Sequence, residues 1–291
     1  MITIDNKYVS DYVFGWHMVD FWTNICLCHS LIIEEREAAD GTIEKIYQGP
    51  SPDEVALVEA GRNVGFVFRE RTKDGILLDM QVATHTSHSM PPLKATFQGH
   101  EVHFELLNVL EFNSDRKRMS VIAKCSDGTL RVFCKGADNV MLKLLKSDLD
   151  PDLIRSTEQS LYDFSVKGLR TLVLGTRLLE QKEYEAWDAR YQSAARSLSE
   201  DREAQINAIA EELEQNFELV GLTAIEDKLQ TGVPHAIETL RLAGMKVWMI
   251  TGDKMETAIN IGISCNLITS QDVLRLTADD PEGHCNTLGG S

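Results

Sequence analysis

The sequence has little proline and cysteine, few aromatic residues and a shortage of positive charge. Its 291 residues include 7 prolines and 6 cysteines, 7% are aromatic, and 29 lysines and arginines face 45 aspartates and glutamates. The formal net charge of −16 argues against binding nucleic acid or an anionic membrane surface through bulk electrostatics. No run approaches the roughly 18 apolar residues of a membrane-spanning helix, and no basic segment followed by an apolar core marks a secretory signal. Any membrane part is therefore expected outside this chain.

The cysteines form neither a disulfide framework nor a metal-binding pattern. They are scattered, mostly in apolar runs, which predicts buried thiols in a reducing cytosol. Cys26-Leu27-Cys28-His29 contains ligand-type side chains, but its cysteines are one residue apart in a helical pattern, and no second pair follows at zinc-finger spacing. Four histidines flank a polar, proline-containing loop at residues 85–103, which favours a solvated loop. We expect no metal site.

The first 216 residues are expected to form an antiparallel sheet with flanking helices. Alternating runs rich in β-branched and aromatic residues, joined by short polar turns, predict a hairpin, a three-stranded meander and one later strand. The expected strands are residues 66–68, 76–80, 102–112, 119–124, 129–133 and 169–174. Apolar residues at helical spacing predict helices at 21–33 and 151–167, and the acidic stretch 180–215 predicts one or two exposed helices.

After residue 216 the pattern changes to that of a parallel α/β sheet. Apolar runs at 217–225 and 246–250 are separated by an amphipathic helix at 233–243, and a further helix is expected at 255–265. This order predicts a right-handed βαβ unit. We therefore expect an α+β chain with a domain boundary near residue 216. In such sheets ligands bind at the carboxyl ends of strands, where Thr251-Gly252-Asp253 falls.

A strand-to-helix turn at Lys135-Gly136-Ala137-Asp138 is a candidate nucleotide site. Gly136 and Ala137 leave the backbone open to a bulky ligand, and Lys135 is a lone cation at the end of a strand. An ammonium group suits the polyphosphate of a nucleotide, which it meets as a point charge. Taken alone, the same string also fits a solvated turn.

Two segments upstream could complete such a site. Phe112 ends an apolar strand just before Ser114 and Lys117, so its ring could stack on a purine base while the cations meet the phosphates. The alternative is that Phe112 is the last core residue of its strand. Residues 51–54, Ser-Pro-Asp-Glu, have the pattern of a capping box, which offers Glu54 a structural role instead of a ligand.

These motifs together resemble the P-type ATPases, and within them the phospholipid-translocating (flippase) branch. Six strings occur in the family's order, over roughly residues 20–270. They are SPDEVALV (51–58), EFNSDRKRMS (111–120), KGAD (135–138), GLRT (168–171), IEDKLQ (225–230) and TGDK (251–254). The Glu of the first string and the Asp that ends the third favour flippases over cation pumps.

The resemblance implies a domain for each half and a role for each motif residue. Residues 1–216 would be the nucleotide-binding (N) domain, and 217–291 a partial phosphorylation (P) domain, haloacid-dehalogenase-like, with an irregular tail. Phe112 would stack on the adenine, Glu54 would accept from its exocyclic amine, and Lys135 would line the pocket beneath base and ribose. Arg170 would contact the phosphates, and Ser114 and Lys117 would make secondary contacts. The γ-phosphoryl group would be held by Thr251, Gly252 and Asp253.

For the full-length protein, the resemblance implies ATP-driven movement of phospholipid between leaflets through an aspartyl-phosphate. The cofactors would be ATP and Mg²⁺, and the place of action the cytosolic face of a membrane. The partners would be phospholipid and an accessory membrane subunit, with no role for nucleic acid.

The chain also departs from the family pattern. The Asp-Lys-Thr-Gly-Thr string that carries the phosphorylated aspartate does not occur, nor does the later Gly-Asp-Gly metal-binding string. Asp227 belongs to a different motif and is not assigned as nucleophile. We therefore expect an internal fragment or truncated product that binds ATP without turnover, with no catalytic or metal-binding residue assigned. The alternatives are a remnant that no longer binds nucleotide and a soluble haloacid-dehalogenase-type phosphatase, whose Asp-x-Asp string is missing.

Overall fold

The computed structural model describes residues 16–37, 43–80, 100–199, 201–226, 229–252, 255–268, 272–277 and 280–287. The chain forms two compact units, the first made of residues 1–161 and 171–225 and the second of residues 162–170 and 226–291. Most of the predicted loop at 85–103 lies outside the described residues. Asp227 and Asp253 also lie outside them.

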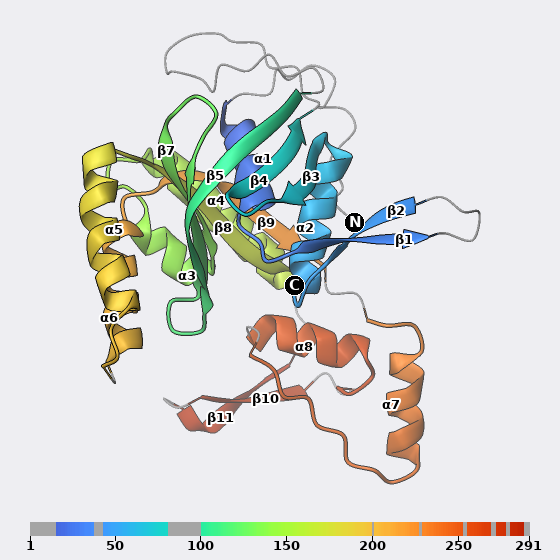
Figure 1. The fold of residues 1–291 in the computed structure, drawn as a ribbon. Helices are drawn as coiled ribbons and strands as arrows, with labels where there is room; N and C mark the ends of the chain where they lie inside the picture. The colour runs from blue at the N-terminus through green and yellow to red at the C-terminus, as the bar shows by residue number, and fades with distance from the viewer. Residues whose placement is uncertain are drawn as a thin grey trace. The chain divides into compact units, whose positions relative to one another are not determined.

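A seven-stranded sheet forms the centre of the first unit, and its strands lie side by side in sequence order (Figure 1). They are β3 (Phe66–Arg71), β4 (Gly75–Met80), β5 (His100–Asn113), β6 (Arg118–Lys124), β7 (Leu130–Gly136), β8 (Arg170–Leu179) and β9 (Glu218–Ile225). Each neighbouring pair from β3 to β8 is antiparallel. The predicted hairpin and meander are confirmed, because alternating apolar runs separated by short turns pair with their sequence neighbours.

Helices cover both faces of this sheet (Figure 1). On one face α1 (Trp16–Leu27) and α2 (Pro52–Asn63) bury an apolar cluster with sheet residues such as Phe104 and Phe133. On the other face α5 (Gln181–Ala195) and α6 (Arg202–Leu213) bury a second cluster with sheet residues such as Ile122. The remaining elements of the chain up to β8 are β1 (Ile32–Glu37), β2 (Ile43–Gln48), α3 (Asp138–Met141), the 3-10 helix η1 (Leu142–Leu144) and α4 (Pro151–Val166). The predicted α+β fold, an antiparallel sheet with flanking helices, is confirmed.

The predicted helix at 21–33 is wrong at its C-terminal end. Helix α1 ends at Leu27, and Ile32 begins strand β1. The β-branched Ile32 and Ile33 pair with Gln48 and Tyr47 of β2, and this pairing outweighs the helical spacing of the apolar residues.

In the second unit the described elements are α7 (Val233–Leu242), α8 (Met255–Ser264) and a hairpin of β10 (Asp272–Thr277) with β11 (Asp280–Thr287). The predicted strand at 246–250 is wrong: these residues have no regular structure, and Trp248 and Ile250 are 83% and 97% exposed. A buried parallel strand needs neighbours on both sides, and no strand in the described ranges pairs with 246–250.

The predicted strand at 217–225 is confirmed as β9, and the predicted helices at 233–243 and 255–265 are confirmed as α7 and α8. The expected place of that strand in a buried βαβ unit is wrong, because β9 lies beside β8 in the sheet of the first unit and most of its residues are only partly buried. The tail, expected to be irregular, contains β11, because pairing with β10 gives its backbone hydrogen-bond partners. The first compact unit ends at Ile225, while a domain boundary near residue 216 stays a prediction.

Among the described residues, no helix combines the length and the apolar character needed to span a bilayer.

Candidate functional site

Glu54 lies in the first turn of α2. The Ser51 side chain caps the helix by accepting a hydrogen bond from the Glu54 backbone N at 3.3 Å, and Pro52 occupies the first turn, as predicted. The Glu54 carboxylate accepts hydrogen bonds from the backbone N and the hydroxyl of Ser30, both at 3.0 Å. The carboxylate therefore ties the helix start to the segment that follows α1, a contact outside the predicted capping box.

Glu54 also forms an ion pair with Lys135, which lies near the end of β7. Lys135 Nζ donates to Glu54 Oε1 at 2.7 Å, and the two side chains are 9% and 14% exposed. Burial alone would raise the pKa of Glu54, but the Lys135 ammonium and the hydrogen bonds from Ser30 outweigh it and lower the pKa. The structure thus joins two candidate site residues that are 81 positions apart.

A bulge in β5 places Phe112 at the level of Lys135 in the sheet. Leu110 pairs with Ser120 and Asn113 pairs with Arg118, so Glu111 and Phe112 together oppose the single residue Met119. Met119 belongs to the apolar cluster under α1 and α2 and pairs with Lys135 of the next strand. Phe112 and Lys135 are therefore two strands apart at the same height, about 10 Å between backbones.

The Phe112 ring is 62% exposed. The alternative that it is the last core residue of its strand is therefore wrong. An exposed ring two strands from a buried ammonium group can stack on one end of an extended planar ligand while the cation contacts its polar parts.

Ser114 and Lys117 lie in the turn between β5 and β6, and both are exposed. Lys117 has a φ of 52°, and its carbonyl accepts a hydrogen bond from Ala137 N at 3.0 Å. This contact joins the turn to the Lys135-Gly136-Ala137 segment. A Cβ at Gly136 would lie 2.6 Å from Arg118 Cβ, so glycine is needed where the two backbones approach.

The remaining predicted site residues belong to the second compact unit or lie outside the residues that the structure describes. Arg170 begins β8 but belongs to the second compact unit. Thr251 and Gly252 are exposed and irregular in that same unit, and Asp253 lies outside the described residues. A common site of these four residues with Phe112 and Lys135 stays a prediction.

Sequence reasoning missed a second cation near Glu54. Arg71, at the end of β3, donates from Nη2 to the carbonyl of His29 at 2.7 Å. Burial lowers the pKa of Arg71, while the charges of Glu111 and Glu54 act in the opposite direction. A single arginine at a strand end carries no sequence signal for this position.

The sequence presents His29 only as a ligand-type side chain next to Cys26 and Cys28. Its side chain is buried, and its Nδ1 accepts from Leu31 N at 3.1 Å, which leaves the proton of a neutral ring on Nε2. Burial, followed by the charges of Arg71 and Lys135, lowers the pKa of His29 to about 3. The ring is therefore neutral at physiological pH and packs edge-on against Phe68.

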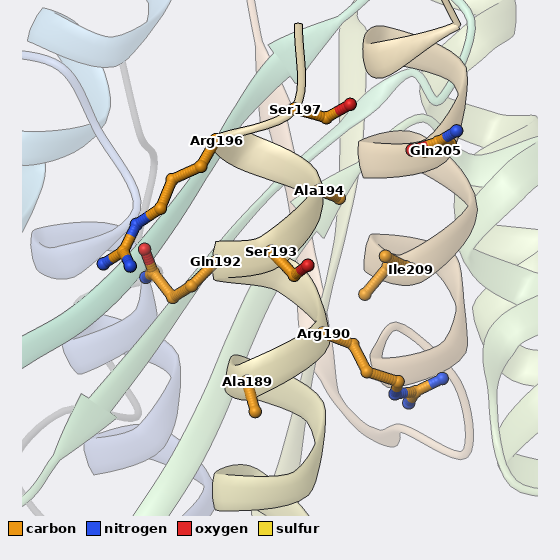
Figure 2. A pocket seen from close by; sticks show the side chains of 9 residues that line it. All are labelled: Ala189, Arg190, Gln192, Ser193, Ala194, Arg196, Ser197, Gln205 and Ile209. Atoms are coloured by element: carbon orange, nitrogen blue, oxygen red, sulfur yellow. The ribbon is translucent and has the colours of Figure 1, made fainter. Parts of the chain in front are cut away.

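A pocket of about 940 Å³ lies at the two helices on the opposite face of the sheet (Figure 2). It is lined by Ala189, Arg190, Gln192, Ser193, Ala194, Arg196, Ser197, Gln205 and Ile209. These residues belong to α5, α6 and the segment between them, and none is a predicted site residue.

The thiols of Cys26 and Cys28 point to different partners, the carbonyls of Phe66 and Phe133. Both are fully buried, and burial raises the pKa of each to about 12. Such thiols are poor metal ligands, because a metal binds the thiolate. In the described ranges no three His, Cys, Asp or Glu side chains cluster in a way that could hold a metal ion.

Comparison with known proteins identifies the family. Residues 17–232 match the family described as "P-type ATPase, cytoplasmic domain N". The chain is 40% identical over 263 residues to phospholipid-transporting ATPase DNF1 of Chaetomium thermophilum, covering 90% of this chain and 16% of that protein. It is 41% identical over 267 residues to DRS2 of Saccharomyces cerevisiae, another phospholipid-transporting ATPase, covering 90% and 18%.

Human phospholipid-transporting ATPase ID is 43% identical over 254 residues, covering 87% of this chain and 19% of that protein. The chain thus spans less than a fifth of the length of these relatives. Because the family match extends over most of the sequence, the chain belongs to the P-type ATPases, in the region of their cytoplasmic domain N.

Proposed function

We propose that this chain binds ATP on the sheet face beside α2, as the nucleotide-binding part of a phospholipid-transporting P-type ATPase. The observation that carries the proposal is the exposed Phe112 ring at the level of the buried Glu54–Lys135 pair, two strands away in the same sheet. The names of the relatives support the wider assignment.

In the proposed complex, the adenine stacks on Phe112 and the base and ribose lie over Lys135. Glu54 Oε1 accepts from Lys135 Nζ, and Oε2 accepts from both the backbone N and the hydroxyl of Ser30. A carboxylate has about four acceptor positions, so Glu54 keeps capacity for the exocyclic amine of adenine. Ser114 and Lys117, in the exposed turn, supply secondary contacts.

The finer assignments concern the phosphates and the full-length protein. We assign Arg170 to the phosphates and Thr251, Gly252 and Asp253 to the γ-phosphoryl group of Mg-ATP, as the resemblance implies. Phosphoryl transfer depends mostly on positioning and charge stabilisation, which suits a nucleotide held by one part of a protein and presented to another. In the full-length protein, an aspartyl-phosphate would couple hydrolysis to phospholipid movement at the cytosolic face of a membrane, together with an accessory membrane subunit.

Replacing Phe112 with alanine should weaken ATP binding by roughly 5- to 150-fold, the range expected for the loss of about 1–3 kcal/mol of base–aromatic stacking. Isothermal titration calorimetry of the chain with ATP measures this directly. Amide chemical shifts around Phe112 and Lys135 should move during the same titration.

Tyr162→Ala is the matched control, because Tyr162 is an aromatic residue of similar exposure, 64% against 62%, and is not among the residues assigned to the proposed site. It should bind ATP like the unchanged chain. If the amide chemical shifts of the unchanged chain do not move at millimolar ATP, the alternative of a remnant that no longer binds nucleotide is favoured.

Incubation with γ-labelled ATP should leave no acid-stable label on this chain. The reason is that the Asp-Lys-Thr-Gly-Thr acceptor string does not occur in its 291 residues. A full-length relative carried through the same acid quench serves as the positive control. Acid-stable label on this chain would contradict the expectation that neither Asp227 nor another of its aspartates is phosphorylated.

A further inference from the structure

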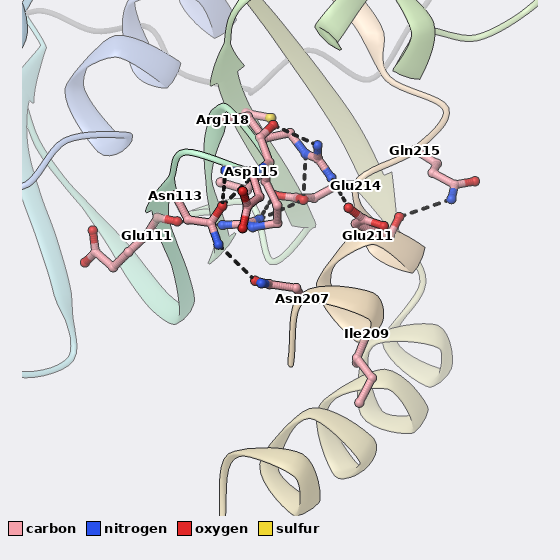
Figure 3. Close-up of polar contacts among 12 residues, drawn as sticks. Glu111, Asn113, Asp115, Arg118, Asn207, Ile209, Glu211, Glu214 and Gln215 are labelled. Carbon is pink, nitrogen blue, oxygen red and sulfur yellow. Dashed lines mark hydrogen bonds and ion pairs between the residues drawn. The ribbon is translucent and has the colours of Figure 1, made fainter. Parts of the chain in front are cut away.

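A buried carboxylate, Glu214, lies beside the turn that joins β5 to β6 (Figure 3). It directly follows α6, and its side chain is 0% exposed. Arg116 Nη1 donates to both of its oxygens, at 2.7 and 2.8 Å, and Arg118 Nε donates at 2.7 Å. The Ser120 hydroxyl donates at 2.5 Å. Glu214 therefore collects donors from the turn and from the first residues of β6, on the face opposite Lys135.

Arg116 extends this contact to the bulge that carries Phe112. Its Nη2 donates to the carbonyl of Glu111 at 2.5 Å. The register between β5 and β6 passes over Glu111 and Phe112, so the guanidinium supplies a donor to a carbonyl outside the strand ladder. One arginine thus connects the buried carboxylate to the residue immediately before Phe112.

The charges make this connection depend on Glu214. The Arg116 and Arg118 side chains are 4% and 5% exposed, and they share one carboxylate. A buried charge is costly unless it is paired, and two guanidinium groups without their carboxylate repel each other. Glu211 is no substitute, because it is 3.8 Å from Arg118 and its side chain is 56% exposed.

The turn itself is held by hydrogen bonds of the Asn113 side chain. Asn113 Oδ1 accepts from the backbone N of Asp115 and of Arg116, both at 2.8 Å, and Asn113 Nδ2 donates to Asn207 of α6 at 3.3 Å. These contacts shape the turn, while the Arg116–Glu111 contact is the one that reaches the bulge. With its ring 62% exposed, Phe112 is oriented mainly through its backbone.

We propose that Glu214 is a positioning residue for nucleotide binding. It acts through Arg116 to hold the Glu111–Phe112 bulge, and so keeps the Phe112 ring in position to stack on a base near Lys135. This inference rests on the proposed function, because the direction of the ring matters for binding only if Phe112 stacks on the base.

A double-mutant cycle tests the proposal with the full 291-residue chain and ATP in a calorimeter. Glu214→Gln should weaken binding by roughly 3- to 30-fold in the unchanged background, and by less than about twofold when Phe112 is already alanine. A residue that only stabilises the fold would lower the affinity by the same factor in both backgrounds.

Two further variants supply a matched control and a replacement for Glu214→Gln. Glu211→Gln, in the exposed neighbour, is the matched control and should bind ATP like the unchanged chain. Arg116→Lys keeps a cation beside Glu214 but loses the Nη2 group that donates to the Glu111 carbonyl. It should therefore lose ATP affinity much as Glu214→Gln does. Its melting temperature should stay closer to that of the unchanged chain. It replaces Glu214→Gln in the cycle if that variant does not fold.

The outcomes separate this inference from the proposed function. If the unchanged chain does not bind ATP, both are overturned. If it binds ATP and the Glu214 and Arg116 variants retain its affinity, or lose the same factor with and without Phe112, only the positioning role is overturned.

Discussion

Replacing Glu214 with alanine is expected to lower the free energy of unfolding by about 3–5 kcal/mol. The substitution removes the carboxylate that accepts from Arg116, Arg118 and Ser120. It leaves two nearly buried guanidinium groups without their partner. Urea denaturation followed by circular dichroism measures the loss.

Glu211→Ala provides the comparison, since Glu211 meets the same Arg118 from an exposed position. That change should cost less than about 1 kcal/mol, as for other surface ion pairs. Converting Glu214, Arg116 and Arg118 together to apolar residues of similar size should recover much of the loss. Similar losses for Glu211→Ala and Glu214→Ala would show that burial does not decide the strength of this network.

His29 should make the chain less stable in mild acid, by about 2 kcal/mol between about pH 7 and about pH 5. Burial lowers its folded pKa from 6.5 to about 3. The contribution of His29 is therefore fully present above its unfolded pKa and is lost as the pH falls from 6.5 toward 3. The unfolded chain takes up a proton over this range, and the folded chain does not.

The measurement is the free energy of unfolding at the two pH values, for the unchanged chain and for His29→Asn. Asparagine can still accept from Leu31 N, but it does not titrate. Subtraction removes every shared group, including Asp20, whose pKa burial raises to about 6 despite its ion pair with Arg131. The exposed His103, changed to asparagine, is the control. An equal pH dependence in His29→Asn and the unchanged chain would contradict the assignment to His29.

The parts of the fold that sequence predicted well are those set by local chemistry. The meander from β5 to β7 follows from alternating apolar residues and short turns. The start of α2 follows from Ser51 and Pro52, whose positions at a helix N-terminus have a direct hydrogen-bonding reason. Both patterns concern residues that lie close together in the chain.

The parts that sequence did not predict depend on distant residues or on strand register. No local sequence pattern predicts that the β5–β6 register shifts by one residue, although this shift decides which residues oppose Met119 and places Phe112 at the level of Lys135. The partner of Arg116 is 98 residues away in the chain. The apolar run at 246–250 has the composition of a buried strand, but composition alone does not supply neighbouring strands, and here it is exposed and irregular.

The long separation between Arg116 and Glu214 has a consequence for the order of assembly on the ribosome. The strands that carry Phe112 and Lys135 are synthesised first, and the carboxylate that fixes the turn between β5 and β6 lies 98 residues after Arg116 of that turn. Until α6 and Glu214 have been synthesised and have packed on the sheet, the turn that follows Phe112 would lack the contact between Arg116 and Glu214. On the proposed positioning role, nucleotide would bind at full affinity only after Glu214 has been synthesised, too late to guide the pairing of β5 with β6.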